Sequence, residues 1–238
     1  MSVTLLPIRR LSVPAAPLSR EAAAPRLVPP PLAKAAQLAE VFAASRDTGA
    51  TGFVLAQVPA GRPVVWVLDR MAAQEAGWPY GPGLRGFGVD PDRLVLVCAR
   101  RAADVLWSME EALGCRSLGA VIGEIWGMPK ALDFTVTKRL AIRAERAGVP
   151  CFLIRYAAEE TLSAARRRWR VTSLASAPHP YDPRAPGAPR WRTTLFRARD
   201  TKPGDWEAGY DRQAHRLDFS AAVSDPALAQ EPERRFGS

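Results

Sequence analysis

The sequence is poor in lysine, cysteine and histidine, and these shortages exclude several kinds of site. Only four of its 33 basic residues are lysines, and it has three cysteines and two histidines. Cys98, Cys115 and Cys151 form no C-x-x-C pair, and His179 and His215 lie far from all three, so we expect neither a metal site nor a disulfide framework. Cys98 and Cys151 lie in apolar runs, which predicts buried thiols in a reducing compartment.

Long apolar runs are also missing. A membrane-spanning helix needs about 20 consecutive apolar residues, and no stretch of the sequence approaches that length. Prolines interrupt residues 1–17, which therefore lack the continuous apolar region of a secretory signal. We expect a cytoplasmic protein with no membrane partner.

Arginine supplies most of the positive charge. The formal net charge is +9, and 47% of the residues are hydrophobic, enough for one sizeable core. A basic surface suits nucleic acid or an acidic protein partner, and equally an ordinary solvated surface. Seven prolines fall within residues 1–31. We predict a flexible proline-rich arm over residues 1–33, a core domain over residues 34–220 and a flexible tail over residues 221–238.

Hydrophobic patterning from residue 38 onward alternates between strands and helices. The apolar runs predict strands at residues 38–42, 63–69, 93–98, 118–125 and 149–155, and helices at residues 52–58, 102–113 and 133–148, with a glycine-rich loop at residues 77–88. Asp133 or Thr135 can cap the last helix, and Gly148 ends it. Residues 190–199 and 206–219 predict an antiparallel hairpin. The order indicates an α/β fold with a mostly parallel sheet and helices on both faces.

The first strand-to-helix junction is where an α/β nucleotide-binding fold holds phosphate. Gly49 and Thr51 match the last glycine and the hydroxyl of the pattern G-x-x-x-x-G-K-[ST], but Ala50 takes the position of the lysine. The leading glycine falls at Ala43 or Ala44. Because the lysine is the main cation for the transferred phosphoryl group, we predict no catalytic residue and no cofactor at this degenerate loop.

Three carboxylates follow the predicted strands. Asp69 and Glu75 follow the second strand, and Glu124 lies at the end of the fourth. One interpretation has them orient a water or hold magnesium for a residual ATPase, with Thr51 and Glu124 as the working pair. The alternative is that they cap helices or pair with surface arginines.

Several segments carry a family resemblance that covers residues 36–220. The runs EVFAASRDTGATGFVLAQV, RPVVWVLDR and LGAVIGEIWG occur in the order and spacing of the RecA core, which is a P-loop NTPase fold. GAVIGEIWGMPKALDFTVTKRLAIRAERAGVPCFLIR and RRRWRV…PHPYDPRAPGAPRWRTTLFRAR resemble the ImuA family more closely. That family comprises RecA-like accessory proteins of the bacterial SOS mutagenesis cassette.

The resemblance implies a non-catalytic adaptor in SOS-induced translesion DNA synthesis after DNA damage. Its implied partners are RecA, an ImuB-type polymerase relative and an error-prone polymerase, with DNA as a further partner. The sequence departs from the recombinases at Ala50 and near Met71, where they carry a lysine and a catalytic glutamate. Distant similarity to SulA leaves a cell-division inhibitor as an alternative, and a residual ATPase or DNA-binding recombinase relative as another.

Two arginine groups are candidates for binding nucleic acid or a protein partner. The spacing of the first puts Arg139, Arg143 and Arg146 on one face of the helix at residues 133–148. The second interleaves basic residues with an aromatic ring, as single-strand binding surfaces do, and comprises Arg166, Arg167, Arg168, Trp169 and Arg170. The alternatives are a solvated helix face for the first group, and a buried Trp169 with extended arginines for the second.

Overall fold

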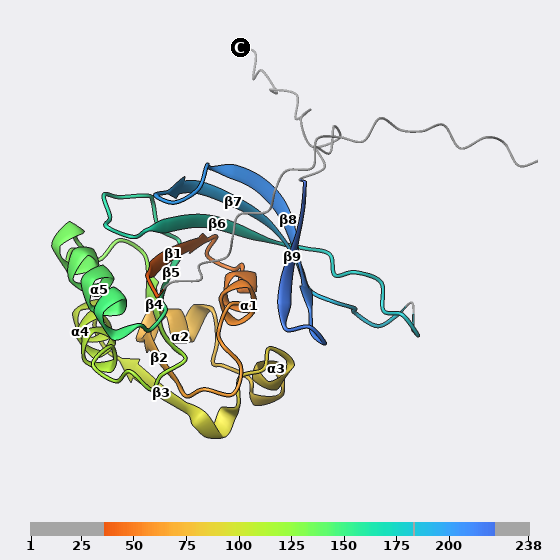
Figure 1. Cartoon of the computed structure of the whole chain (residues 1–238), viewed down its shortest axis with the longest axis horizontal. Coiled ribbons are helices and arrows are strands. Elements are labelled where there is room, and N and C mark those ends of the chain that lie inside the picture. The colour runs from red at the N-terminus through yellow and green to blue at the C-terminus, as the bar shows by residue number, and fades with distance from the viewer. Residues whose placement is uncertain (1–35, 183, 222–238) are drawn as a thin grey trace, which may run out of the picture.

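The computed structural model describes residues 36–182 and 184–221, which form one nine-stranded sheet flanked by helices (Figure 1). The strands are β1 (Leu38–Ala43), β2 (Val64–Asp69), β3 (Leu94–Ala99), β4 (Ala120–Trp126), β5 (Cys151–Tyr156), β6 (Arg167–Leu174), β7 (Arg190–Ala198), β8 (Gly204–Asp211) and β9 (Arg216–Ala221). The helices are α1 (Gly49–Leu55), α2 (Arg70–Glu75), α3 (Gly81–Gly86), α4 (Ala102–Ala112) and α5 (Phe134–Ala147), with a 3₁₀ turn at Pro91–Arg93.

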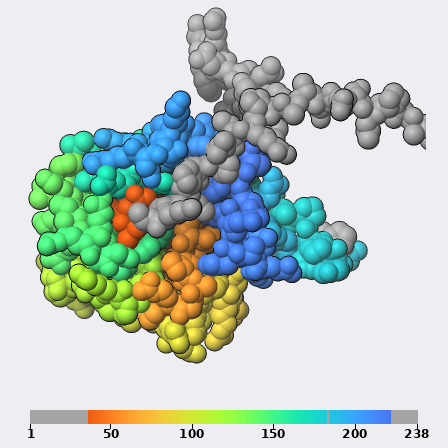
Figure 2. Space-filling model, in the orientation of Figure 1, coloured from red at the N-terminus to blue at the C-terminus, as the bar shows by residue number. Residues whose placement is uncertain are grey.

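The sheet has the order β3-β2-β4-β5-β1-β6-β7-β8-β9. The strands from β3 to β6 run parallel, and β7, β8 and β9 continue the sheet in antiparallel pairing. The prediction of a mostly parallel sheet with antiparallel C-terminal strands is therefore confirmed. Between β6 and β7, the described residues 175–182 and 184–189 project from the body of the molecule (Figure 2).

Helices cover both faces of the sheet, as predicted, because its strands are apolar on both sides. One buried cluster joins α1, α2 and α3 to the sheet, and a second joins α4 and α5 to the opposite face. The best-predicted helix is α5: the Asp133 carboxylate accepts a hydrogen bond from the Val136 amide at 2.8 Å, and Gly148 ends the helix in a left-handed conformation (φ 70°). Leu140 and Ala144 are buried against the sheet.

Two expectations about the elements are wrong, and the basic cluster lies in a strand that was not predicted. The predicted loop at residues 77–88 contains α3, which begins with a proline in its first turn and buries Leu84. The predicted return strand at residues 206–219 is two strands, β8 and β9, because the Asp211 carboxylate organises a tight turn by accepting from the amides of Gln213 and Ala214. Residues 167–170 of the basic cluster form the start of β6.

Strand position also explains the cysteines. Cys98 is exposed, contrary to the prediction, because β3 is the edge of the sheet and has a neighbour on one side only. Cys151, in β5 near the centre, is buried as predicted, and Cys115 is exposed. The predicted arm and nearly all of the predicted tail lie outside the described residues. Within the described ranges, no helix has the length and apolar character needed to cross a membrane.

Candidate functional site

The turn between β1 and α1 lies where the resemblance places a phosphate-binding loop. It leads from Ala43, the last residue of β1, to Gly49, the first residue of α1. Ala50, where the predicted alignment expects the lysine, is fully buried in the core beside Phe53 and Val54. The methyl group of Ala50 therefore contributes to packing, and the loop has no cation at this point.

A carboxylate occupies the start of α1. Asp47 accepts a hydrogen bond from the Gly49 amide at 3.0 Å. The same carboxylate accepts from the Ser173 amide of β6 at 2.8 Å and from the Ser173 hydroxyl at 2.5 Å. The approach is close: a Cβ atom on Gly49 would lie 2.0 Å from the Ser173 hydroxyl oxygen, so a larger residue at this position would displace the Ser173 side chain. Because helix N-termini attract anions through free amides, a fixed carboxylate in this place opposes a phosphate group.

Thr51, Glu124 and Tyr156 meet at the carboxyl ends of the central strands. The Thr51 hydroxyl donates to Glu124 Oε1 at 3.2 Å and lies 2.8 Å from the Tyr156 hydroxyl, which can donate to it. Thr51 and Glu124 are both candidates from the sequence, and the structure brings them into direct contact. In the described part of the chain, no three histidine, cysteine, aspartate or glutamate side chains cluster as metal ligands would.

Glu124 is the buried acid of this group. Burial raises the pKa of Glu124 to about 7, and the charge of nearby Asp69 adds to the rise, whereas the Thr51 hydroxyl and the Trp66 side chain oppose it. Asp69 itself is fully engaged, since it caps α2 through the Ala72 amide at 2.7 Å and accepts from the Trp126 amide at 2.9 Å. Asp69 is therefore a helix cap, which is the second of the two interpretations of this residue.

A cavity of about 220 Å³ opens beside Glu124. Thr51 of α1 and Trp66 of β2 line its inner part, and the segment from Ala76 to Phe87 closes the other side. Four aromatic rings take part, those of Trp66, Trp78, Tyr80 and Phe87. We call this cavity the aromatic pocket.

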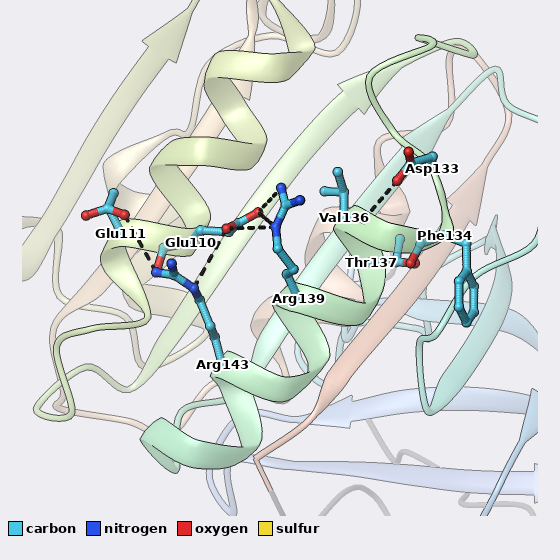
Figure 3. Close-up of polar contacts among 8 residues, drawn as sticks. All are labelled: Glu110, Glu111, Asp133, Phe134, Val136, Thr137, Arg139 and Arg143. Carbon is cyan, nitrogen blue, oxygen red and sulfur yellow. Dashed lines mark hydrogen bonds and ion pairs between the residues drawn. The ribbon is translucent and has the colours of Figure 1, made fainter.

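The arginines predicted on one face of α5 reach across to α4 (Figure 3). Arg139 donates to both carboxylate oxygens of Glu110, at 2.8–3.2 Å. Arg143 donates to the Glu110 carbonyl oxygen at 2.9 Å, and its Nη1 atom lies 3.6 Å from Glu111 Oε1. These two arginines therefore hold the helices together, and part of their charge is neutralised within the protein.

Arg146 is exposed, as are the other two arginines of the predicted face. Among the described residues, no acidic side chain forms an ion pair with it. It lines a shallow surface with Arg116 and Arg143 at the C-terminal ends of α4 and α5. The sequence pattern missed Arg116, because it lies beyond the end of α4 and only folding brings it to Arg146.

The second arginine group is built into the sheet. Trp169 is 1% exposed, and its ring packs 5.4 Å from Phe53 and 6.2 Å from Trp206 between ring centroids. A base cannot stack on a ring in this position. Trp169 is therefore buried as the alternative has it, but Arg167 and Arg168 are buried too and do not extend into solvent. Four arginines of this group have acidic partners, in the pairs Arg166–Glu145, Arg167–Asp200, Arg168–Glu40 and Arg170–Glu160.

Glu40 is the centre of a buried charge cluster that the sequence did not reveal. Its Oε2 atom accepts from Arg168 Nε at 2.6 Å, and its Oε1 atom lies 4.0 Å from Arg155 Nη1. Both guanidinium groups lie over the Phe42 ring, at 5.2 and 5.5 Å from its centroid. All three charged side chains are buried, so a single carboxylate stands between two cations in the interior.

Known proteins resemble this chain along most of its length. Over 192 residues the chain is 34% identical to Protein ImuA of two strains of Caulobacter vibrioides, and the match covers 74% of this chain and 74% of each relative. The chain belongs to the ImuA family. No family model matches it. The resemblance to ImuA read from the sequence is thereby confirmed.

Protonation of Glu124 should make the free energy of unfolding of this ImuA-family protein depend on pH. The folded protein holds a proton on Glu124 up to about pH 7, whereas a glutamate in the unfolded chain loses its proton near pH 4.5. The folded state thus binds more protons between these values, so stability falls as pH rises through this window. We expect Glu124→Gln to remove that fall, a difference on the order of 3 kcal/mol between pH 4 and pH 8. Urea denaturation at several pH values measures it.

The matched control for this experiment is Glu75→Gln, which changes an exposed glutamate of the nearby helix α2. Its unfolding free energy should follow the same pH dependence as the unmodified protein. Parallel curves for Glu124→Gln and the unmodified protein would show that Glu124 ionises normally in the folded state.

Proposed function

We propose that this protein is a non-catalytic, RecA-like adaptor in SOS-induced translesion DNA synthesis, which binds RecA, an ImuB-type polymerase relative or an error-prone polymerase. Membership of the ImuA family supports the context. The absence of catalysis is proposed from the start of α1. There the Asp47 carboxylate accepts a hydrogen bond from the Gly49 amide, and the buried Ala50 stands where the lysine is expected. Nucleotide phosphates would meet a negative charge and no lysine there.

The shallow surface of Arg116, Arg143 and Arg146 is the contact region that we assign to the adaptor. It includes Arg146, which is the member of the predicted helix face that forms no ion pair with a described residue. Charge complementarity at the rim of an interface mainly speeds association and selects partners. An acidic surface on a protein partner or a nucleic-acid phosphate backbone fits it.

Binding assays with purified components test the proposal. We expect the tagged full-length chain to retain RecA or one of the two polymerase-like proteins on a column, and Arg146→Glu to weaken the retained complex severalfold, because the reversed charge repels an acidic partner. Arg192→Glu, which changes an exposed arginine on β7, is the matched control and should bind normally. Retention of none of the three proteins would contradict the adaptor role.

Phosphate release from ATP distinguishes the residual ATPase from the adaptor. The close pair of Thr51 and Glu124 is the observation in favour of the enzyme. We expect no release above background, alone or with DNA, and no difference between the unmodified protein and Thr51→Ala. Release that disappears in Thr51→Ala would replace the adaptor proposal with an ATPase.

A further inference from the structure

The aromatic pocket has a composition unlike that of a phosphate site. Of the described residues that line it, Glu124 is the one with a charge, and no lysine or arginine contributes to the wall. The remaining lining is mainly aromatic, glycine or small apolar. We propose that the aromatic pocket binds an organic cation, an alkylguanidinium or alkylammonium group, with Glu124 as its counter-ion. This proposal does not depend on the adaptor role, because the aromatic pocket shares no residue with the arginine surface assigned to the adaptor.

Aromatic faces attract cations through the negative charge above and below the ring, most strongly in a partly desolvated site. Trp78 and Tyr80 stand at the mouth of the pocket with 59% and 73% of their surfaces exposed. Large rings so exposed commonly mark a binding surface. Phe87 and Trp66 extend the aromatic lining inward.

Buried donors support the carboxylate form of Glu124. The Thr51 hydroxyl donates to Oε1, and Tyr156 can donate to Thr51 in turn. The indole N–H of Trp66 is buried and, among the described residues, has no hydrogen-bond partner at ordinary distance and angle, yet it lies close enough to lower the pKa of Glu124. A buried donor without a partner is costly. Ionisation of Glu124 gives this N–H a charged acceptor, and a cation in the pocket favours that ionisation.

The size of the pocket fits the end of a basic chain. A water molecule occupies about 30 Å³ of liquid, so 220 Å³ holds several water-sized groups, as a guanidinium with its last methylene groups requires. Binding ionises the protonated fraction of Glu124 and releases that proton to the solvent. Affinity should therefore rise with pH. The titratable or polar groups that face Glu124 are Asp69, Thr51, Trp66 and Tyr156, and none of them supplies a positive charge.

Calorimetry on the full chain with defined probes tests the site. The probes are acetyl-Gly-Arg-Gly-amide, its neutral citrulline counterpart and the free diamine putrescine. For an acid with a pKa of about 7, we expect the arginine peptide to bind about tenfold more tightly at pH 8 than at pH 6. The citrulline peptide should bind at least about tenfold more weakly at pH 8. Tighter binding of the peptide would assign the cation to a polypeptide side chain, and tighter binding of putrescine to a free amine.

Variants separate the charge from the rings. Glu124→Gln should lose about tenfold in affinity at pH 8 and lose the pH dependence, while its circular dichroism stays native. Trp78→Ala should bind severalfold more weakly but keep the pH dependence, because the counter-ion remains. Trp107→Ala, an exposed tryptophan on α4 outside the pocket, is the matched control. Equal binding of the arginine and citrulline peptides, unchanged affinity in Glu124→Gln, or no binding of either cation at pH 8 would overturn the proposal.

Discussion

Replacing Glu40 with glutamine should lower the free energy of unfolding by about 3–5 kcal/mol, the usual cost of breaking a buried ion pair on one side. The substitution keeps the shape of the side chain and removes its charge. Arg168 and Arg155 then face each other in the interior without a carboxylate between them. Burial lowers the pKa of Arg155, and the Glu40 charge opposes this effect only in part. Loss of Glu40 therefore makes the charged form of Arg155 less favourable in the folded protein. Urea denaturation followed by circular dichroism measures the loss.

Two further variants test whether the loss in Glu40→Gln comes from the buried charge cluster. Glu160→Gln breaks the pair with Arg170, a contact in which 30% and 55% of the two side chains are exposed, and should cost no more than about 1 kcal/mol. Adding Arg168→Gln to Glu40→Gln should recover part of the loss, since it removes one of the two cations. A loss below about 1 kcal/mol for Glu40→Gln would mean that water or rearrangement already compensates both arginines.

Replacing Trp169 with alanine should cost about 3–5 kcal/mol, because the cavity left by a large core side chain closes only in part. The indole is in contact with rings from three elements: Phe53 of α1, Trp206 of β8 and Phe219 of β9, with centroids 5.4–6.3 Å away. It therefore ties the antiparallel strands to the parallel part of the sheet. Thermal and urea denaturation of the variant check the expected loss.

The control for Trp169 is another tryptophan. Trp107 on α4 is 65% exposed, and Trp107→Ala should change stability by no more than about 0.5 kcal/mol. Trp169→Phe keeps an aromatic ring in the same place and should lose less than the alanine variant. Similar stabilities for Trp169→Ala and Trp107→Ala would contradict the placement of Trp169 in the core.

Local signals made part of this structure predictable. The two ends of α5, at Asp133 and Gly148, were predictable because capping depends on residues within one turn of the helix end. Leu140 and Ala144 lie on its buried face because helical spacing alone decides which side chains share a face. The parallel strands β1 to β5 are mainly apolar, so their predicted ends agree with the structure within two residues.

The partners of the arginines were not predictable in the same way. Arg168 meets a glutamate 128 residues earlier in the chain, and Arg139 meets one 29 residues earlier. No periodicity within a helix or strand contains that information. For the same reason the sequence singled out Thr51 and Glu124 but not the aromatic pocket, whose rings come largely from a segment that was predicted to be a loop.

The central place of β1 in the sheet sets the order in which the protein can assemble. β1 lies between β5 and β6, with Leu38 opposite Cys151 and Ala39 opposite Arg167. A chain synthesised from its N-terminus must extend beyond residue 174 before β1 has both neighbours, and closing such long loops slows folding. Nascent or truncated chains that end before residue 151 would leave both edges of β1 open to pairing with other chains.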